Sequence, residues 1–541
     1  MIQAPHFPAP DVVARYRSHG WWGDRTFADI LEARVAAHPD RPVFTDARRS
    51  LTYAELWSQV KRFAEFLRRQ GLSRGDVVTL QMPNRIEFPV VFFALEMIGA
   101  VANKISSDLR AVEVDYILRF SKSKAYVCAR EFKGFDYVDM IGSIRGGLPD
   151  LVTAICVDAT DAPGLVSLAA ALETTPEIAE TERVRMSADE IMRMCFTSGT
   201  TGNPKGVLHS FNTTLCAAEF FNRYLAVDEK DVFLIYLPVG LNWGYLSLLQ
   251  TVMAGARAVL MERFSARAAL ETIERERVTY VPTAPASIVA MLNADDLASR
   301  DLSSLRIVIT GGASASIETI RAFQVALPGV KLIELYGMLE TGFHSITRLT
   351  DDPLKVNGTI GRCIDELELA LLDDDGRPVA RGQQGEIAAK GPSVHLGYLD
   401  NDAANRDSFN ADDWFLSGDL GEVVDDDGNV RISGRKKEMI NRGGKKFFPR
   451  EIEEILYEHP AFLQVAIVGM PDPRLGERNC LCAIVKPGHR VTLDETVRLL
   501  KGRVADYKLP EQLEIREEIP MTPSGKIRRG ELVKELVREG R

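Results

Sequence analysis

The stretch from Thr197 to Gly206 holds the residue types best suited to binding a polyphosphate. It contains three glycines, four hydroxyl side chains and one lysine. Glycines let a backbone turn closely and point its amide groups at an anion, the hydroxyls add further donors, and the lysine adds a mobile positive charge. The residues predicted to contact phosphate are Thr197, Ser198, Gly199, Thr200, Thr201, Gly202 and Lys205.

Two other interpretations of this stretch fit less well. A nucleotide-binding P-loop needs Gly-x-x-x-x-Gly-Lys followed by Ser or Thr, whereas here Pro204 precedes the lysine and Gly206 follows it. A flexible linker of Gly, Ser and Thr is the second alternative. Residues 191–196 immediately upstream alternate apolar and polar residues like a strand, however, and a linker needs no strand to deliver it.

In two later segments, an expected strand is followed directly by residues suited to binding a nucleotide. Residues 306–310 run into three small residues, where a flat ring can lie against exposed backbone, although taken alone this segment is more simply a tight turn. Residues 331–335 lead into a Tyr-Gly pair with a carboxylate four positions after the tyrosine. The tyrosine is suited to stacking on adenine and the carboxylate to binding magnesium. The residues concerned are Gly311, Gly312, Ala313, Tyr336, Gly337 and Glu340.

The decamer from Thr197 to Gly206 resembles the signature of the adenylate-forming superfamily, which comprises acyl-CoA synthetases, aryl-acid adenylating enzymes and luciferases. Residues 336–340 resemble that family's Tyr-Gly-x-Thr-Glu motif except at Leu339. The family threonine is expected near the α-phosphate, so the resemblance leaves Thr200, Thr201, backbone or water to supply that donor. Aryl-acid adenylating relatives also lack a hydroxyl here, so we interpret Leu339 as tuning and not as inactivation.

Further motifs follow in the family's order. Residues 414–421 resemble the motif whose carboxylate, here Asp419, binds both ribose hydroxyls, although an Asp after Gly is most often a turn residue. The resemblance makes Arg435 the second ribose contact and Lys437 the hinge of the last domain. It also assigns a basic glycine turn to coenzyme A, where the alternative is a solvated loop. That turn comprises Gly443, Gly444 and Lys445.

Near the end of the chain, residues 520–529 resemble the family's Pro-x-Thr-x-Ser-Gly-Lys motif. A lysine in such a position is usually a surface residue. On a loop of Pro, Gly and Ser, however, Lys526 is mobile enough to enter a site built by another domain, where its charge opposes the repulsion between a carboxylate and the α-phosphate. The predicted catalytic residues are Lys526, Thr200 and Glu340, and Glu340 is the predicted metal ligand.

The acid pocket is expected around residues 237–244. Many relatives have a histidine after the proline, and here Leu241 or a neighbour stands instead. Asn242 offers a polar contact and Trp243 a flat wall, which favours a small aromatic or cyclic acid over a long fatty chain, although a tryptophan beside glycine is more often core. The predicted pocket comprises Leu241, Asn242, Trp243, Gly312 and Met338.

The resemblance covers residues 53–526 and implies an α/β fold with a large N-terminal domain of two sheet-and-helix lobes plus a distorted β-barrel, and a small mobile α+β C-terminal domain. The residue patterns agree. Strands alternate with helices up to residue 310, brief strands typical of an antiparallel or barrel-like unit follow from residue 365, and a mixed segment ends the chain. At 541 residues the chain is too long for one core, and we expect domains at 1–434 and 435–541.

The composition argues against several classes of partner and site. A formal net charge of -10 makes nucleic acid an unsuitable partner, and the longest apolar run, residues 88–95, is too short to cross a membrane. The seven cysteines lack metal spacing, and Cys480 and Cys482 are expected to pack on one strand face. No secretion signal is visible at the N-terminus, so we expect a cytoplasmic protein.

The resemblance implies an acid:CoA ligase that uses ATP, Mg²⁺ and coenzyme A and acts on a small aromatic, alicyclic or short- to medium-chain acid. An aryl-acid adenylating enzyme that loads a carrier protein is the nearest alternative. A non-catalytic nucleotide-binding relic of the fold is the alternative from another class, and the presence of Lys205, Glu340, Asp419, Arg435 and Lys526 together argues against it. A homodimer is left open.

Overall fold

The computed structural model describes residues 2–158, 161–197, 204–312, 315–521 and 527–540. Its first sheet has seven strands in the order β11-β10-β4-β3-β5-β8-β9, and only the β10–β11 pair is antiparallel. The strands are β3 (Val77–Gln81), β4 (Val101–Lys104), β5 (Ala125–Cys128), β8 (Thr153–Cys156), β9 (Leu165–Ser167), β10 (Ile191–Phe196) and β11 (Gly206–Ser210). The helices of this lobe are α3 (Tyr53–Arg69), α4 (Glu87–Met97), α5 (Ala111–Phe120), α6 (Tyr137–Ile144), α7 (Leu168–Thr174) and α8 (Phe211–Tyr224).

The second sheet has nine strands in the order β18-β17-β16-β15-β14-β12-β13-β1-β2, with parallel pairing from β16 through to β1. Its strands are β1 (Pro42–Thr45), β2 (Ser50–Thr52), β12 (Val232–Ile235), β13 (Arg257–Leu260), β14 (Tyr280–Thr283), β15 (Ile307–Gly311), β16 (Lys331–Met338), β17 (Gly342–Ile346) and β18 (Arg362–Cys363). Its helices are α9 (Asn242–Ala254), α10 (Ala266–Glu276), α11 (Pro285–Leu292) and α12 (Ile317–Ala326). The chain before β1 forms α1 (Pro10–Ser18) and α2 (Phe27–Ala37), and a small ribbon of β6 (Glu131–Phe132) and β7 (Phe135–Asp136) follows β5.

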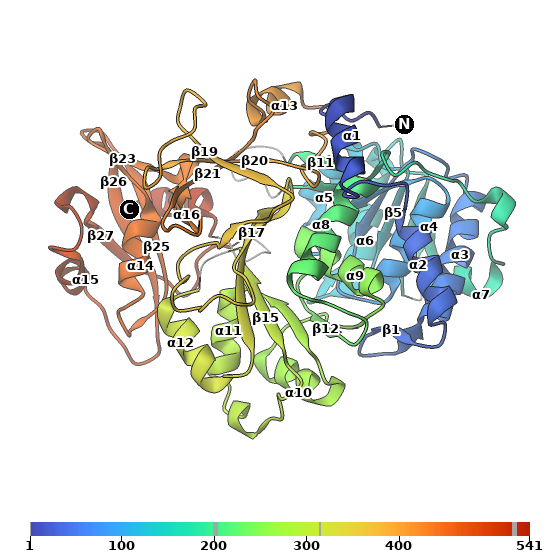
Figure 1. The fold of residues 1–541 in the computed structure, drawn as a ribbon, viewed down its shortest axis with the longest axis horizontal. Helices are drawn as coiled ribbons and strands as arrows, with labels where there is room; N and C mark the ends of the chain where they lie inside the picture. Colours follow the sequence, from blue (N-terminus) through green and yellow to red (C-terminus); the bar gives the residue numbers. More distant parts are fainter. Residues whose placement is uncertain (1, 159–160, 198–203, 313–314, 522–526, 541) are drawn as a thin grey trace.

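The two lobes share one main core, because the apolar residues of α3, α4, α8 and α9 pack between the two sheets. The outer face of the first sheet is covered by α5 and α6, and that of the second by α10, α11 and α12. In Figure 1 the first lobe lies at the right in blue and green, and the second lies at the bottom in yellow-green. The predicted pair of sheet-and-helix lobes is therefore confirmed.

The later part of the chain forms two smaller sheets. An antiparallel sheet of four strands in the order β19-β20-β21-β22 fits the antiparallel unit expected from residue 365, with α13 (Asp402–Ser408) in the connection from β20 to β21. Its strands are β19 (Glu368–Leu372), β20 (Gly385–Lys390), β21 (Phe415–Val423) and β22 (Val430–Arg435).

The last sheet has the order β24-β23-β26-β25, with β27 paired to β26, and it carries helices on both faces at the left of Figure 1. Cys480 and Cys482 are buried on the face covered by α16, which confirms their predicted packing role. The elements are β23 (Ile440–Arg442), β24 (Lys445–Phe447), α14 (Pro449–Leu456), β25 (Phe462–Asp472), β26 (Gly476–Val485), α15 (Leu493–Leu500), β27 (Gln512–Ile515) and α16 (Arg529–Arg538).

Local signals fix several of these boundaries. A capping box starts α3, since the Thr52 hydroxyl accepts from the Glu55 amide and the Glu55 carboxylate accepts from the Thr52 amide. β14 begins only at Tyr280, because the Val278 amide donates to the Ile273 carbonyl and so completes the end of α10. Within the described ranges, no helix combines the length and apolar character that crossing a bilayer requires.

The shared core gives a stability prediction. Phe93 on α4 is 1% exposed, with its ring centre 5.7 Å from that of Phe92 and 6.5 Å from that of Phe27. Phe93→Ala should lower the free energy of unfolding by about 3 to 5 kcal/mol, because the lost ring leaves a cavity between the sheets. Val325→Ala, at an 84% exposed position of α12, is the control and should change it by less than about 0.5 kcal/mol. Urea unfolding measures both, and equal midpoints for the two variants would contradict the shared core.

Candidate functional site

The β10–β11 hairpin holds the two ends of the predicted phosphate loop together. The Thr197 amide donates to the Lys205 carbonyl at 3.0 Å, and the Lys205 amide donates to the Thr197 hydroxyl at 3.3 Å. The loop therefore leaves and re-enters the sheet at one point, at the carboxyl end of β10. Its middle lies outside the described residues, so the roles predicted for Ser198, Gly199, Thr200, Thr201 and Gly202 stay predictions.

Lys205 and Glu340 meet at the ring of Tyr398. The Lys205 ammonium lies 4.6 Å from the centre of that ring, and the Tyr398 hydroxyl donates to Glu340 Oε1 at 3.2 Å. Burial, with the Glu340 carboxylate adding to it, raises the pKa of Tyr398, so the hydroxyl remains a donor. The structure thus brings the lysine of the phosphate loop and the predicted metal ligand to one place.

The Glu340 carboxylate fits a hard cation such as Mg²⁺, which prefers oxygen ligands. In the part of the chain that the structure describes, no three His, Cys, Asp or Glu side chains are grouped so as to hold a metal ion among themselves. A magnesium at Glu340 would therefore take most of its ligands from phosphate oxygens and water, as is usual for this ion.

A second cluster joins the nine-stranded sheet to the four-stranded sheet. The Tyr336 hydroxyl at the end of β16 donates to Asp419 Oδ2 at 2.8 Å, and Asp419 Oδ1 lies 3.0 Å from Arg435 Nε. Asp419 on β21 and Arg435 on β22 are register partners, so the antiparallel ladder sets this ion pair. Three residues that the sequence predicted for the adenosine part of a nucleotide are thus in contact.

Electrostatic interactions connect the two clusters. Burial is the largest single effect on the pKa of Arg435 and lowers it, but the charges of Asp419, Glu438, Tyr336 and Glu340 together outweigh burial, so the pKa is raised overall. Burial, followed by the charge of Asp419, raises the pKa of Tyr336 well above its usual range. The guanidinium stays charged and the phenol stays protonated, which gives one fixed cation and one fixed donor around Asp419.

Glycines at the ends of β15 and β16 allow close backbone approach. A Cβ at Gly311 would lie 2.9 Å from the Leu335 carbonyl oxygen, and one at Gly337 would lie 2.2 Å from the Gly342 carbonyl oxygen. Gly312 has a φ of +80°, which favours glycine. Packing of the strand ends requires Gly311 and Gly337, the backbone conformation favours Gly312, and a nucleotide contact remains a prediction. Ala313 lies outside the described residues.

The predicted acid-pocket residues gather where α9 begins. Leu241 precedes the helix. The side-chain amide of Asn242 donates to the Met338 carbonyl at 3.4 Å, which connects α9 to the end of β16. Trp243 packs against the main core, in line with the alternative that its sequence context suggested. Asn242 Oδ1 and Trp243 Nε1 are both buried and lack hydrogen-bond partners among the described residues.

The predicted hinge residue lies two residues beyond Arg435, and the turn predicted to bind coenzyme A belongs to the last sheet. Lys437 is in the short turn Lys436–Glu438 after β22, and residues 443–444 form the turn between β23 and β24. That turn contacts other residues of the last sheet: the Gly443 amide donates to the Leu475 carbonyl at 2.7 Å, and the Lys445 ammonium lies 5.1 Å from the centre of the Tyr507 ring. Gly443 and Gly444 both have positive φ.

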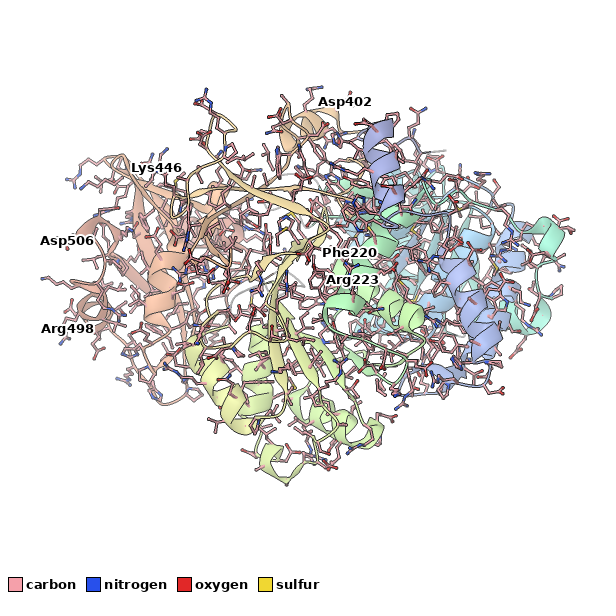
Figure 2. The ribbon with its side chains drawn as sticks, viewed as in Figure 1. Phe220, Arg223, Asp402, Lys446, Arg498 and Asp506 are labelled. Atoms are coloured by element: carbon pink, nitrogen blue, oxygen red, sulfur yellow. The ribbon has the colours of Figure 1, made fainter. Side chains whose placement is uncertain are left out.

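Figure 2 places the basic turn within the molecule. It shows the neighbouring Lys446 at the upper left periphery, well separated from Phe220 and Arg223 of α8 at the centre. The contacts described above join this turn to Leu475 and Tyr507, in the C-terminal part of the chain. The predicted catalytic Lys526 lies outside the described residues.

Sequence reasoning missed Tyr398 and His209. Tyr398 follows β20 in a connection with no motif that marks it, and an isolated bridge with Val207 places it beside the phosphate loop. His209 on β11 lies with its Nε2 2.8 Å from the Leu339 carbonyl oxygen and its Nδ1 3.1 Å from the Thr213 hydroxyl. Only a protonated Nε2 can donate to a carbonyl, so His209 fixes the backbone next to Glu340.

Two family models and several known proteins match this chain. The family model described as AMP-binding enzyme matches residues 31–399, and the one described as AMP-binding enzyme C-terminal domain matches residues 451–526. The chain is 33% identical to a medium-chain fatty-acid–CoA ligase of Escherichia coli K12, over 97% of this chain and 93% of that protein. It is 31% identical to a 2,3-dihydroxybenzoate-AMP ligase of Bacillus subtilis, over 96% and 95%.

Among solved structures, the anthranilate CoA ligase AuaEII in complex with anthranoyl-AMP matches with a TM-score of 0.88 at 26% identity, covering 96% of this chain and 98% of that one. This likeness fits a large N-terminal and a small C-terminal domain.

His209 predicts a pH dependence of stability. Burial, and then the nearby charge of Arg193, lowers the pKa of His209 well below 6.5, so the folded protein keeps the ring neutral while the unfolded chain binds a proton. The stabilisation is therefore complete above about pH 6.5 and is lost as the pH falls below that value. His209→Gln, which can keep both hydrogen bonds, should reduce the loss of thermal stability between pH 7 and pH 5, measured by calorimetry. The exposed His489→Gln is the control, and an unchanged pH dependence in His209→Gln would contradict this account.

Proposed function

The chain belongs to the AMP-binding enzyme family, and from that premise we propose that it is an ATP-dependent acid:CoA ligase. It activates a carboxylic acid as acyl-AMP with release of pyrophosphate, and it then transfers the acyl group to the thiol of coenzyme A with release of AMP. The observation that carries the proposal is the contact of Tyr336 with Asp419 and of Asp419 with Arg435. Tyr336 lies four residues before Glu340 in the chain.

Each side chain has a task in the first half-reaction. The Asp419 carboxylate accepts hydrogen bonds from the ribose hydroxyls, and Arg435 holds that carboxylate in place through their ion pair. Tyr336 lies beside adenine, and Thr197 and Lys205 hold the phosphates together with the middle of their loop. A magnesium ion on Glu340 would offset the negative charge of the phosphates. Tyr398 positions the Glu340 carboxylate through its hydroxyl.

The second half-reaction uses the C-terminal part of the chain. We propose a domain boundary at residues 434–435 with Lys437 as the hinge, so that Lys526 enters the site for adenylation and leaves before thioester formation. The turn of Gly443, Gly444 and Lys445 then contributes to the path of coenzyme A. The contacts of this turn with Leu475 and Tyr507 support its movement together with the C-terminal part of the chain. The cytoplasmic location and a homodimer stay predictions.

A carrier protein is the alternative acceptor. One observation favours it: Leu339 replaces the family threonine, and its side chain packs against the cluster of Val207, Tyr398 and Ala404. We favour coenzyme A because the residues 445–449 and the segment 522–526 match the acyl-CoA synthetase pattern better.

The acceptor is tested by measuring AMP release with a panel of aromatic, alicyclic and short- to medium-chain acids, with and without coenzyme A. We expect release to depend on coenzyme A and acyl-CoA to accumulate in equal amount. Adenylation that proceeds without any effect of coenzyme A would overturn the choice of acceptor. Failure of hydroxylamine to trap any acyl-AMP across the panel would contradict the ligase activity itself.

Leu339→Thr tests our interpretation of the missing hydroxyl. The side chain packs at the edge of the site, and its backbone carbonyl is already bound by His209, so the exchange should leave the rate of adenylation within about tenfold, or about 1.4 kcal/mol. Pyrophosphate exchange measures the rate. A change of several hundredfold in either direction would show that the position controls catalysis.

A further inference from the structure

Two buried positive side chains lie near the residues predicted for the acid pocket, and neither has an ion-pair partner among the described residues. Lys104, the last residue of β4, is 0% exposed, and Arg193 on β10 is 1% exposed. Their strands are neighbours, with Ala102 opposite Arg193 and Lys104 opposite Cys195. Residues two apart on a strand share a face, so both side chains extend from the same face of the seven-stranded sheet.

The hydrogen-bonding capacity of this pair is largely unused. Arg193 Nε donates to the Thr214 hydroxyl at 2.9 Å, whereas Arg193 NH1 has no hydrogen-bond partner among the described residues. Lys104 Nζ has no oxygen or nitrogen acceptor there and interacts only with the neighbouring Cys195 thiol. Both lie against the Tyr245 ring of α9, at 4.7 Å for the ammonium and 5.1 Å for the guanidinium. An aromatic face compensates only part of the cost of removing two cations from water.

Burial also affects the protonation of both groups. It lowers the pKa of Lys104 to about 8 and lowers the pKa of Arg193. An anion placed between them would restore both values and supply the missing acceptor. Natural proteins rarely keep two adjacent buried cations unpaired, so the arrangement indicates a missing negative group.

The pair lies along the elements that build the acid pocket. Tyr245 is on α9, three residues after Asn242, and its hydroxyl also lacks a hydrogen-bond partner among the described residues, as do Asn242 Oδ1 and Trp243 Nε1. The Cys195 thiol, opposite Lys104, lies 3.7 Å from the Gly240 carbonyl oxygen just before that helix. These unpaired polar groups therefore belong to one region between the strand face and α9.

The strand also sets a length scale. β10 runs directly into Thr197 at the start of the phosphate loop. A strand advances ~3.3 Å per residue, so along β10 the backbone of Cys195, with Lys104 opposite it, lies ~7 Å before Thr197. The backbone of Arg193 lies ~13 Å before Thr197. An extended chain advances ~1.3 Å per bond, so this span corresponds to roughly five to ten bonds.

We propose that Lys104 and Arg193 bind a second carboxylate of the acid substrate, at the end remote from the carboxylate that is activated. This inference rests on the proposed function and names its substrate class: a medium-length dicarboxylic acid. The first carboxylate lies at the phosphate loop, the chain runs along the face of β10 beside α9, and the second carboxylate pairs with the two cations.

The test compares each linear diacid of about six to ten carbon atoms with its own monomethyl ester, which has the same chain but a single carboxylate. Pyrophosphate exchange gives kcat/KM for both. The wild-type protein should prefer the diacid by about tenfold or more. Lys104→Met and Arg193→Met should each remove most of that preference while leaving the ester at the wild-type level or above it, and Arg193→Lys should retain part of it. Arg257→Met, on β13 and paired with Glu276, is the matched control and should keep the full preference.

The outcomes separate this inference from the proposed function. If the wild-type protein activates monocarboxylic acids but uses diacid and ester equally, or if both Met variants keep the preference, the second-carboxylate site is wrong and the ligase activity stands. If no acid supports exchange, the ligase proposal fails and this inference fails with it. Because the wild-type comparison alone decides the first case, the test holds even where a Met variant does not fold. Thermal stabilisation of the wild-type protein by the diacid, and not by the ester, is the expected binding signature.

Discussion

The Asp419 carboxylate is the interaction on which the arrangement of the site depends. It accepts a hydrogen bond from Tyr336 at the end of the nine-stranded sheet and pairs with Arg435 at the end of the four-stranded sheet. A carboxylate that is 5% exposed needs such partners, because an unpaired buried charge is costly. The same contacts that stabilise the charge therefore also fix how the two sheets meet, and they hold one acceptor at the point where a nucleotide is proposed to bind.

The rest of the site follows from the way parallel sheets end. β10, β15 and β16 end at the edge where polar groups are available, as is usual for ligand sites in open α/β sheets. Tyr398 then connects two of these ends, since its ring lies under Lys205 and its hydroxyl binds Glu340. His209 completes the arrangement by holding the Leu339 carbonyl. Contacts between residues far apart in sequence thus convert separate strand ends into one site.

Local sequence patterns predict much of the fold, but they do not predict contacts between residues that are far apart in the sequence. Thr52 and Glu55 predict the start of α3, because a capping box is built from residues close in sequence. The alternation of strands and helices predicts the parallel sheets of the two lobes. Tyr398 could not be predicted, because its role depends on a bridge to Val207 nearly two hundred positions away. Lys104 and Arg193 also escaped notice: a charged residue in a strand is usually exposed, and only the sheet order shows that both are buried.

Nucleotide binding tests the central claim most directly, because it needs neither the acid nor the acceptor. Calorimetry should show that the wild-type protein binds ATP about tenfold or more tightly than 2′,3′-dideoxy-ATP, the loss expected when hydrogen bonds to a charged group are removed. In Asp419→Asn, ATP should bind as weakly as the dideoxy nucleotide does, and the two nucleotides should no longer differ. A variant that folds and still discriminates between them as the wild-type protein does would show that Asp419 does not hold the ribose.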